Sequence, residues 1–253
     1  MLPETTSNDP SVVFITMHKA GSVIANEILA SLLGPEGLVH VNFATNAFDL
    51  GVREQPYCAE RVHLLRTPGY YFGAFRQTTS DWFGDLSSNR LIFQIRDPRD
   101  CIVSLYFSYR YSHPEPGNGS VTPLFDSLRK EARQSNIDEY AIKKIDEYLK
   151  RFRIINSLMD KFQNHILVRY EDMVLCFRQW LSDISDFLGV NPSQETLGAL
   201  MKLANFDVAK EDVNLHKRQV TPGDFSRKLA PETQKKLTEA FSCYLEKFRY
   251  NAK

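Results

Sequence analysis

The chain has 253 residues, a length that supports one large hydrophobic core, so we expect a single domain over residues 1–253 with residues 1–10 flexible. Its 31 lysines and arginines balance its 31 aspartates and glutamates, and this neutrality gives no reason to expect a nucleic-acid or membrane partner. A binding site for an anion would therefore have to be built from a few local residues.

The sequence carries no sign of export or of a metal site. The opening MLPETTSNDP lacks the basic and apolar regions of a secretion signal, and no apolar run reaches the roughly 20 residues that a bilayer span needs. The four cysteines lie far apart, without the paired spacing of a zinc site or a disulfide framework. We therefore expect a soluble, cytoplasmic protein that uses no metal.

A buried strand is predicted over residues 12–17, followed by a helix from Ser22 to Leu33 whose apolar residues recur at helical spacing. In the turn between them, Gly21 lets main-chain N–H groups approach an anion, and the helix amino terminus adds about half a positive charge. Lys19 adds a full charge and Ser22 a hydroxyl donor, which suits phosphate or sulfate. The lysine precedes the glycine, whereas it follows the glycine in the Walker A motif, so a solvated lysine beside a helix start is the alternative.

The next elements lie in two apolar stretches. RVHLLRTPGYYFGAFR (residues 61–76) predicts two more extended segments, and RLIFQIRDPRDCIVSLYFSYRY (residues 90–111) predicts a strand that runs directly into a helix. Arg96 ends that strand, Asp97 is a good helix N-cap and Pro98 suits the first helical position.

Arg96 is predicted at the carboxyl end of a parallel strand, where open α/β sheets bind ligands, and its planar guanidinium suits phosphate. Ser104 follows eight residues later, two turns into the helix. The alternative is that Arg96 simply pairs with the nearby Asp100. The sequence thus offers a second turn that could bind an anion.

The rest of the chain alternates helices with one further strand. Residues 112–123 read as a loop rich in proline and glycine, and residues 137–162 place apolar side chains three or four apart, as in one long amphipathic helix. HILVRYED (residues 165–172) predicts a strand, followed by a helix that ends at FLG, and residues 231–249 predict a closing helix. This alternation indicates an α/β, three-layer fold with a mostly parallel central sheet and helices on both faces.

The two turns together resemble the cofactor-binding elements of the sulfotransferase family, which transfers a sulfuryl group from 3′-phosphoadenosine 5′-phosphosulfate (PAPS) to an acceptor. HKAGSV is similar to the family's phosphosulfate loop, Pro-Lys-Ser-Gly-Thr-Thr, and the Arg-x-Pro-x-Asp pattern with its later serine is similar to the 3′-phosphate signature. The resemblance implies a P-loop NTPase-like fold. It implies cofactor contacts from Lys19, Ala20, Gly21, Ser22, Val23, Arg96 and Ser104, with Lys19 also catalytic.

Three later segments continue the resemblance in the same order. VRYEDMV is similar to a Tyr-Glu-Asp segment that would place Tyr170 near the adenine, and ANFDVAK to a segment that would make Phe206 a stacking residue. RQVTPGDFSRKL resembles the late Arg-Lys-Gly-x-x-Gly-Asp-Trp loop, which implies that Arg218 binds the 3′-phosphate. Gln219 and Val220, which depart from that pattern, would contact the cofactor from the same loop.

The resemblance is incomplete at the general base. Family members commonly carry a histidine on the strand just upstream of the 3′-phosphate signature, and Ala74 stands at that position here. The candidate substitutes are His63, His40, Asp81 and Glu60, of which His63 and Asp81 come first because they flank the same segment. A neutral nitrogen acceptor would need less assistance than a hydroxyl, for which a positioned base contributes typically about 10²–10⁴-fold.

The acceptor pocket is expected between residues 40–86 and the loop 106–123, both rich in aromatic residues. We expect a small polar acceptor with a hydroxyl or nitrogen, such as a natural product, and no metal. Oligomeric state stays open, because SRKLAPETQK lacks the dimerisation motif found in part of the family. The alternatives are a P-loop phosphotransferase or NTPase, and a non-catalytic PAPS-binding module, which the missing histidine would favour.

Overall fold

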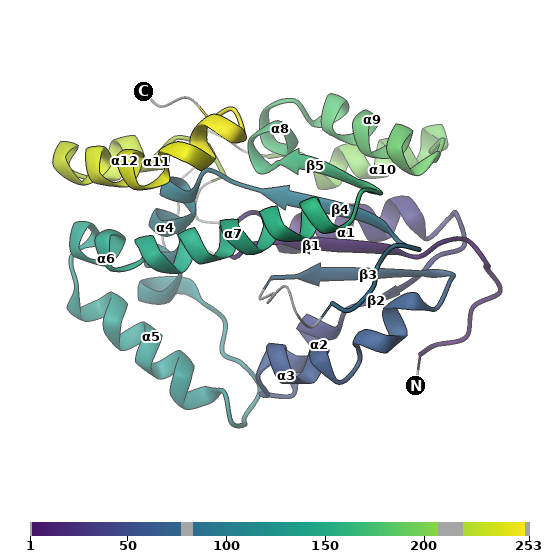
Figure 1. The fold of residues 1–253 in the computed structure, drawn as a ribbon, viewed down its shortest axis with the longest axis horizontal. Coiled ribbons are helices and arrows are strands. Elements are labelled where there is room, and N and C mark those ends of the chain that lie inside the picture. Colours follow the sequence, from purple (N-terminus) through teal and green to yellow (C-terminus); the bar gives the residue numbers. More distant parts are fainter. Residues whose placement is uncertain (1, 77–82, 207–219, 251–253) are drawn as a thin grey trace.

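A parallel sheet lies at the centre of the computed structural model, which describes residues 2–76, 83–206 and 220–250 (Figure 1). Within these residues the sheet has five strands in the order β2-β3-β1-β4-β5, and every neighbouring pair is parallel. The strands are β1 (Val12–Thr16), β2 (Val39–Val41), β3 (Tyr70–Phe75), β4 (Arg90–Ile95) and β5 (His165–Arg169). Because all strands run the same way, the segments that follow β1, β4 and β5 meet at one edge of the sheet.

Helices cover both faces of this sheet, as the sequence predicts. Val13 and Ile15 of β1 point into one core and Val12 and Phe14 into the other, since side chains alternate along a strand. The first core is closed by α4 (Pro98–Phe107), α6 (Ile137–Lys143), α7 (Ile145–Lys161) and α12 (Pro231–Lys247). The second is closed by α1 (Ser22–Leu33), α8 (Tyr170–Leu175), α9 (Phe177–Leu188) and α10 (Gln194–Leu203). The three-layer α/β prediction is therefore confirmed, and Figure 1 shows α7 crossing in front of the sheet.

Shorter elements complete the described parts of the chain. They are α2 (Phe43–Asp49), α3 (Glu54–Ala59), the 3₁₀ turn Val62–Arg66, the π turn Ser108–Ser112, α5 (Thr122–Gln134) and α11 (Asp224–Lys228). None of the helices in the described ranges combines the length and the apolar character needed to cross a bilayer.

Two predicted elements differ from the structure. The first half of residues 61–76 is a 3₁₀ turn and not an extended segment. In that turn Leu65 is fully buried and its carbonyl accepts a hydrogen bond from Asn89 Nδ2 at 2.7 Å. Short apolar runs of this kind have no periodicity that separates a turn from a strand, so only the tertiary contact decides.

The single helix predicted over residues 137–162 is broken at Lys144 into α6 and α7. The Lys144 side chain is buried, and its Nζ lies 2.8 Å from Glu131 Oε2 on α5. This contact ties Lys144 to α5. The apolar residues keep their helical spacing through this point, so the sequence pattern does not reveal the break. The predicted strand at residues 165–172 is also shorter, because Tyr170 already begins α8.

Candidate functional site

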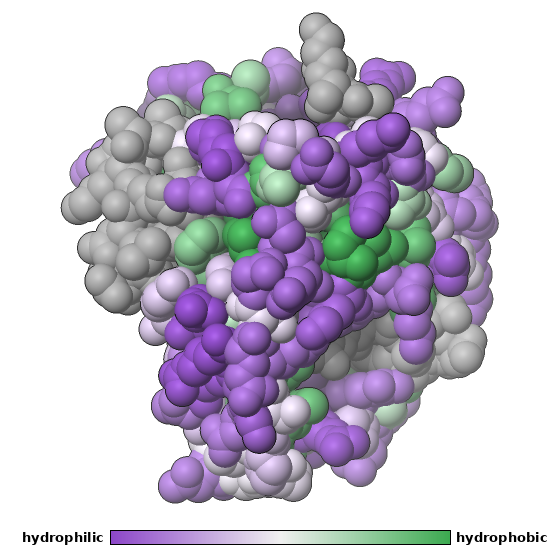
Figure 2. Space-filling view, turned by 90° about the vertical axis from the view of Figure 1, so that its left-hand side faces the viewer, coloured by the Kyte–Doolittle hydropathy of each residue, from purple (hydrophilic) through white to green (hydrophobic). Residues whose placement is uncertain are grey.

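A cavity of about 760 Å³ lies at the edge of the sheet where the strands end. Its lining includes Lys19 and Ser22, which follow β1, Arg96 and Ser104, which follow β4, and Tyr170, which follows β5. Figure 2 views the molecule from the side toward which the strands of Figure 1 point, and this face is mostly hydrophilic with apolar residues gathered near its middle. Segments far apart in sequence are therefore brought to one place by the parallel sheet.

The turn after β1 is held by side chains from the end of β4. Arg96 Nη1 donates to the carbonyl oxygen of Lys19 at 2.9 Å, and Gln94 Nε2 donates to the carbonyl oxygen of Ala20 at 2.7 Å. Lys19 has φ +70°, which is uncommon for a residue with a side chain. The two hydrogen bonds hold this conformation and join the two predicted anion-binding turns into one unit.

Helix α1 begins at Ser22 with Gly21 as its N-cap, and no side chain in the described part of the chain caps its first turn. The first amides of a helix have no partner within the helix, so those of Ser22 and Val23 are suited to an anion. Gly21, Ser22 and Val23 line the cavity. Ala20, also a predicted cofactor contact, is fully buried, and its N–H donates to the carbonyl oxygen of Met17 at 3.3 Å.

Arg96 is 4% exposed and lines the same cavity. Its guanidinium carbon lies 4.2 Å from the centre of the Tyr170 ring, and Nη2 lies 3.8 Å from Asp100 Oδ2. Arg96 therefore faces Asp100, the partner considered in the sequence analysis, and also forms part of the cavity wall. Arg96 Nε is buried and has no hydrogen-bond partner in the described structure, which fits a site for an anionic ligand.

The start of α4 follows the sequence prediction. Asp97 is its N-cap and accepts a hydrogen bond from the Arg99 amide at 2.9 Å, and Pro98 occupies the first position. Asp100 reaches further, because its carboxylate accepts hydrogen bonds from the amides of Gly223 at 2.6 Å and Phe225 at 2.9 Å. These bonds tie the late loop of the chain to the 3′-phosphate-like signature.

Tyr170 connects three of the predicted motifs. Its ring packs so closely on Gly21 that a Cβ atom built there would lie 2.7 Å from Tyr170 Cδ2. Its hydroxyl donates to the carbonyl oxygen of Val220 at 2.8 Å, and Arg96 lies over its ring. Phe206 and Val220 also line the cavity.

Arg218 and Gln219, predicted cofactor contacts from the late loop, lie outside the described residues. Ser104 is half-buried and lines the cavity two turns into α4, as its spacing from Arg96 predicts. Among the described candidates, the predicted phosphosulfate and 3′-phosphate residues therefore share one cavity, with Ala20 as the exception.

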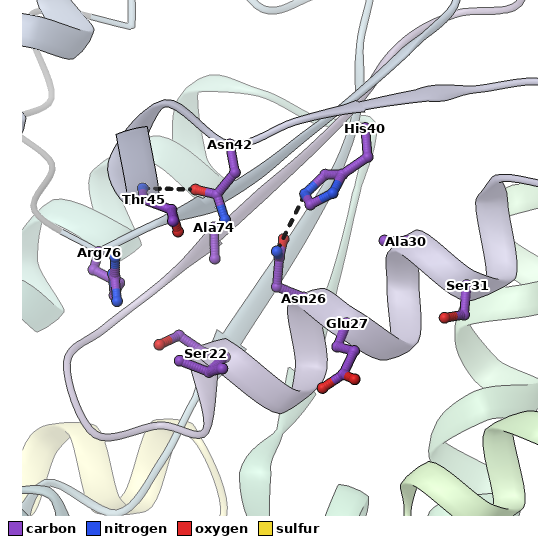
Figure 3. A pocket seen from close by; sticks show the side chains of 11 residues that line it. Ser22, Asn26, Glu27, Ala30, Ser31, His40, Asn42, Thr45, Ala74 and Arg76 are labelled. Atoms are coloured by element: carbon purple, nitrogen blue, oxygen red, sulfur yellow. Dashed lines mark hydrogen bonds between the residues drawn. The ribbon is translucent and has the colours of Figure 1, made fainter. Parts of the chain in front are cut away.

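Ala74 lines a second cavity of about 500 Å³ beside α1 and is not part of the lining of the larger one (Figure 3). The same small cavity contains His40, whose Nε2 lies 3.2 Å from Asn26 Nδ2, while Asn26 Oδ1 accepts from the Tyr71 hydroxyl at 2.8 Å. With the amide nitrogen as donor, His40 Nε2 is the acceptor in this chain of hydrogen bonds. Gly73 leaves room for it, since a Cβ atom there would lie 2.5 Å from Asn26 Oδ1.

Of the base candidates proposed from the sequence, His63, His40 and Glu60 do not line the large cavity. His63 is exposed on the 3₁₀ turn and lines neither cavity, and Asp81 lies outside the described residues. Two histidines that the sequence reasoning missed, His18 and His113, do line the large cavity. The signal was available, because His18 adjoins Lys19 and His113 lies in the loop already expected to form the acceptor pocket.

The pKa of His18 is lowered well below its ordinary value. Burial is the largest cause, and the positive charges of Arg151, Arg76 and Lys19, together with His113, add to it. The His18 imidazole is therefore neutral near pH 7 and a weak proton acceptor. Its carbonyl oxygen accepts a hydrogen bond from the Tyr148 hydroxyl at 3.2 Å.

The remainder of the large cavity is lined by aromatic and aliphatic side chains, two carboxylates and two arginines, Arg53 and Arg76. Phe48, Tyr109 and Phe125 contribute rings, and Asp49 and Glu54 contribute carboxyl groups. The lining comes from α2, α3, the loop after α4 and the first half of α5. The segments expected to form the acceptor pocket are thus largely the ones that surround the cavity beyond the two anion-binding turns.

The sulfotransferase domain family model matches residues 85–248 of the chain. Sulfotransferase 2A1 of Rattus norvegicus is 29% identical over 128 residues, which cover 50% of this chain and 40% of the rat protein. Sulfotransferase 2A2 of Mus musculus is 27% identical over 126 residues, again covering 50% of this chain and 40% of the mouse protein. The matched segment therefore spans less than half the length of these relatives.

Two solved structures share the fold across most of the chain. A mouse sulfotransferase, SULT7A1, complexed with PAP superimposes with a TM-score of 0.60 at 17% identity, covering 95% of this chain and 86% of that one. Retinol dehydratase in complex with androsterone and the inactive cofactor PAP gives a TM-score of 0.56 at 14% identity, with 93% and 80% covered. At these identities the likeness concerns the fold.

Proposed function

The chain belongs to the sulfotransferase domain family, and we propose that it transfers a sulfuryl group from PAPS to a hydroxyl or nitrogen of a small polar acceptor. The observation that carries the proposal is the hydrogen bond between Arg96 and the Lys19 carbonyl. This bond makes one anion-binding unit from two turns that the sequence separates by more than 70 residues. A ligand with two separate phosphate-type groups is the natural occupant of such a unit.

The residues present fit PAPS. Lys19, the Ser22 hydroxyl and the amides of Ser22 and Val23 would hold the 5′-phosphosulfate, while Arg96 and Ser104 would hold the 3′-phosphate. The buried Arg96 Nε without a partner among the described residues supports this assignment, because a buried charged donor normally has one. Each charge-assisted hydrogen bond contributes about 1.5–3 kcal/mol. Arg218 and Gln219 would complete the site from the late loop.

PAPS supplies the sulfuryl group and a phosphate that leaves with the electron pair. Lys19 would stabilise the negative charge that develops on that leaving phosphate. The setting of its turn matters here, because hydrogen bonds from Gln94 and Arg96 hold the main chain at Lys19 and Ala20 and limit its reorganisation during the reaction. The surrounding residues align the acceptor with the sulfur, which is the main task of a protein in transfers of this kind.

The acceptor side supports a molecule with an apolar body and a polar reactive group, such as a natural product. Phe48, Tyr109 and Phe125 offer flat apolar surface, and the carboxylates of Asp49 and Glu54 suit a hydroxyl or a nitrogen that carries a proton and reacts in its neutral form. Glu54 is fixed in position, because its Oε1 accepts a hydrogen bond from the Arg76 amide at 3.2 Å.

The test is calorimetry in EDTA with adenosine 3′,5′-bisphosphate, the product that PAPS leaves behind. We expect tight metal-free binding, and at least tenfold weaker binding of adenosine 5′-monophosphate, which lacks the 3′-phosphate, as the matched control. Failure of the bisphosphate to bind, together with binding of magnesium-ATP in a separate experiment, would replace the proposal by a phosphotransferase or NTPase.

Turnover then separates the enzyme from a non-catalytic PAPS-binding module. A panel of phenols, alcohols and amines, assayed by release of the bisphosphate from PAPS, should contain at least one acceptor. Tight binding of the bisphosphate, with no transfer to any acceptor and no release of sulfate to water, would favour the module.

A further inference from the structure

We propose that His113 is the general base of this enzyme, taking the place of the histidine that the family carries where Ala74 stands. The proposal rests on the proposed function, since it assigns a role within the same cavity. His113 lines the large cavity together with Lys19 and Ser104, whereas Ala74 lines only the smaller one. The base would thus come from the loop after α4 and no longer from strand β3.

The hydrogen bonding of His113 determines which ring nitrogen carries the proton. Nδ1 lies 2.8 Å from the carbonyl oxygen of Pro114. A carbonyl oxygen only accepts, so Nδ1 must be the protonated nitrogen, and in the neutral ring Nε2 is then the nitrogen that accepts a proton. The Pro114 carbonyl therefore plays the orienting part that a third group plays beside catalytic histidines in general.

The ring of His113 is also held in place by aromatic contacts. It stacks on Tyr109 with ring centres 4.9 Å apart and planes 15° apart, and it contacts Phe125 at 5.1 Å and Phe48 at 6.2 Å. Its main-chain amide donates to the carbonyl oxygen of Ser108 at 2.8 Å, which anchors the loop to the end of α4. A base fixed in this way loses little entropy when it takes up a proton.

The other histidines in the described parts of the chain are less suited to the role. His40 lines only the small cavity, His63 is exposed outside both cavities, and His216 lies outside the described residues. His165 is at the opposite edge of the sheet, where β5 begins. His18 is in the cavity, but burial and its cationic neighbours lower its pKa well below the ordinary value and weaken it as a proton acceptor.

The proposed transfer step conserves atoms, electrons and charge. The acceptor oxygen or nitrogen forms a bond to sulfur while its proton moves to His113 Nε2, which makes the imidazole positively charged. The bond from sulfur to the phosphate oxygen breaks, and the electron pair stays on that oxygen beside Lys19. The protonated imidazole then releases its proton to solvent, which restores the neutral ring for the next cycle.

The test uses water as the acceptor, so it needs no knowledge of the natural substrate. Sulfate release from PAPS and transfer to 4-nitrophenol are measured from pH 6 to 9 for the wild type, His113→Ala and His113→Asn. Asparagine keeps an N–H that can donate to the Pro114 carbonyl but lacks a proton acceptor equivalent to Nε2. We expect both variants to lose about 10²–10⁴-fold in the reaction with water, with affinity for adenosine 3′,5′-bisphosphate unchanged.

The acidity of the acceptor supplies a second readout that a structural role would not move. Because 4-nitrophenol is largely ionised at pH 8, its sulfation should fall much less in the two variants than the reaction with water. Added imidazole should restore part of the activity of His113→Ala. The matched control is His63→Ala, which we expect to behave as the wild type.

The outcomes distinguish failure of the His113 assignment from failure of the proposed function. Unchanged rates and pH profiles in His113→Ala would overturn the assignment, and a selective loss in Glu54→Gln instead would transfer the role to that carboxylate. Equal losses for water and 4-nitrophenol would also overturn it, because they would indicate a positioning defect. If the wild type fails to bind adenosine 3′,5′-bisphosphate, or binds it without any turnover of PAPS, the proposed function itself is overturned.

Discussion

Arg96 Nη1 donates a hydrogen bond to the main-chain carbonyl oxygen of Lys19 at 2.9 Å, across 77 residues of sequence. The bond is possible because β1 and β4 are adjacent parallel strands and each residue follows the end of its strand. The same guanidinium lies over the Tyr170 ring, so one side chain links the turns that follow three strands. Binding at one turn is therefore coupled to the geometry of the other.

Replacing Arg96 by lysine should weaken binding of adenosine 3′,5′-bisphosphate by about 10–100-fold, or about 1.4–2.8 kcal/mol. Lysine keeps the positive charge. Its ammonium group cannot at the same time donate to the Lys19 carbonyl, stack on the Tyr170 ring and face Asp100. Calorimetry measures the change. The control is Arg90→Lys at the start of the same strand, where Nη1 donates to the Leu188 carbonyl at 2.7 Å. Equal affinities in both variants would contradict the prediction.

Gly21→Ala should reduce bisphosphate affinity at least tenfold and lower the free energy of unfolding. The new Cβ would lie 2.7 Å from the Tyr170 ring, and φ at this position is +70°. Gly189→Ala is the matched control, because φ there is +68° and nothing lies within 4 Å of the new Cβ. Both variants should lose about 1–2 kcal/mol of stability from the backbone conformation, but only Gly21→Ala should lose affinity. Calorimetry and denaturant unfolding give the two quantities.

Lys19→Met should lower the rate of sulfuryl transfer by about 10²–10³-fold, because the charge that faces the leaving phosphate is removed. Affinity for the bisphosphate should change much less, since the amides of α1 and Arg96 are intact. Single-turnover measurements with PAPS separate the chemical step from binding. A near-normal rate would show that Lys19 has no part in the transfer.

Glu171 should make stability depend on pH. Burial raises its pKa from 4.5 to about 7, although its carboxylate accepts hydrogen bonds from the Asp97 amide at 3.0 Å and the Tyr250 hydroxyl at 3.2 Å. A pKa that is higher in the folded state favours folding at low pH. That contribution is full below about pH 4.5 and is lost as the pH rises through about 7.

Denaturant unfolding of the wild type and Glu171→Gln at pH 5 and pH 8 measures this effect. The wild type should lose on the order of 3 kcal/mol relative to the variant between the two conditions. Glutamine keeps a hydrogen-bond acceptor for the Asp97 amide but does not titrate. Parallel pH dependence in the two proteins would show that Glu171 does not carry the effect.

Local sequence patterns were sufficient to predict where α4 begins and where α9 ends. Asp97, Pro98 and Gly189 act through bonds and dihedral angles within a few residues, so they signal the same structure in any context. The break at Lys144 and the turn around Leu65 were not predictable in this way. Each depends on a partner distant in sequence, Glu131 in one case and Asn89 in the other.

The sequence by itself determined the layered α/β fold and the two turns predicted to bind an anion, because apolar periodicity and the short motifs around Lys19 and Arg96 are local properties. Only the tertiary structure decided which residues share a cavity. It separated Ala74, His40 and His63 from the large cavity and brought His18 and His113 into it. Strand order and loop packing set those distances, and neither is encoded in the spacing of residues along the chain.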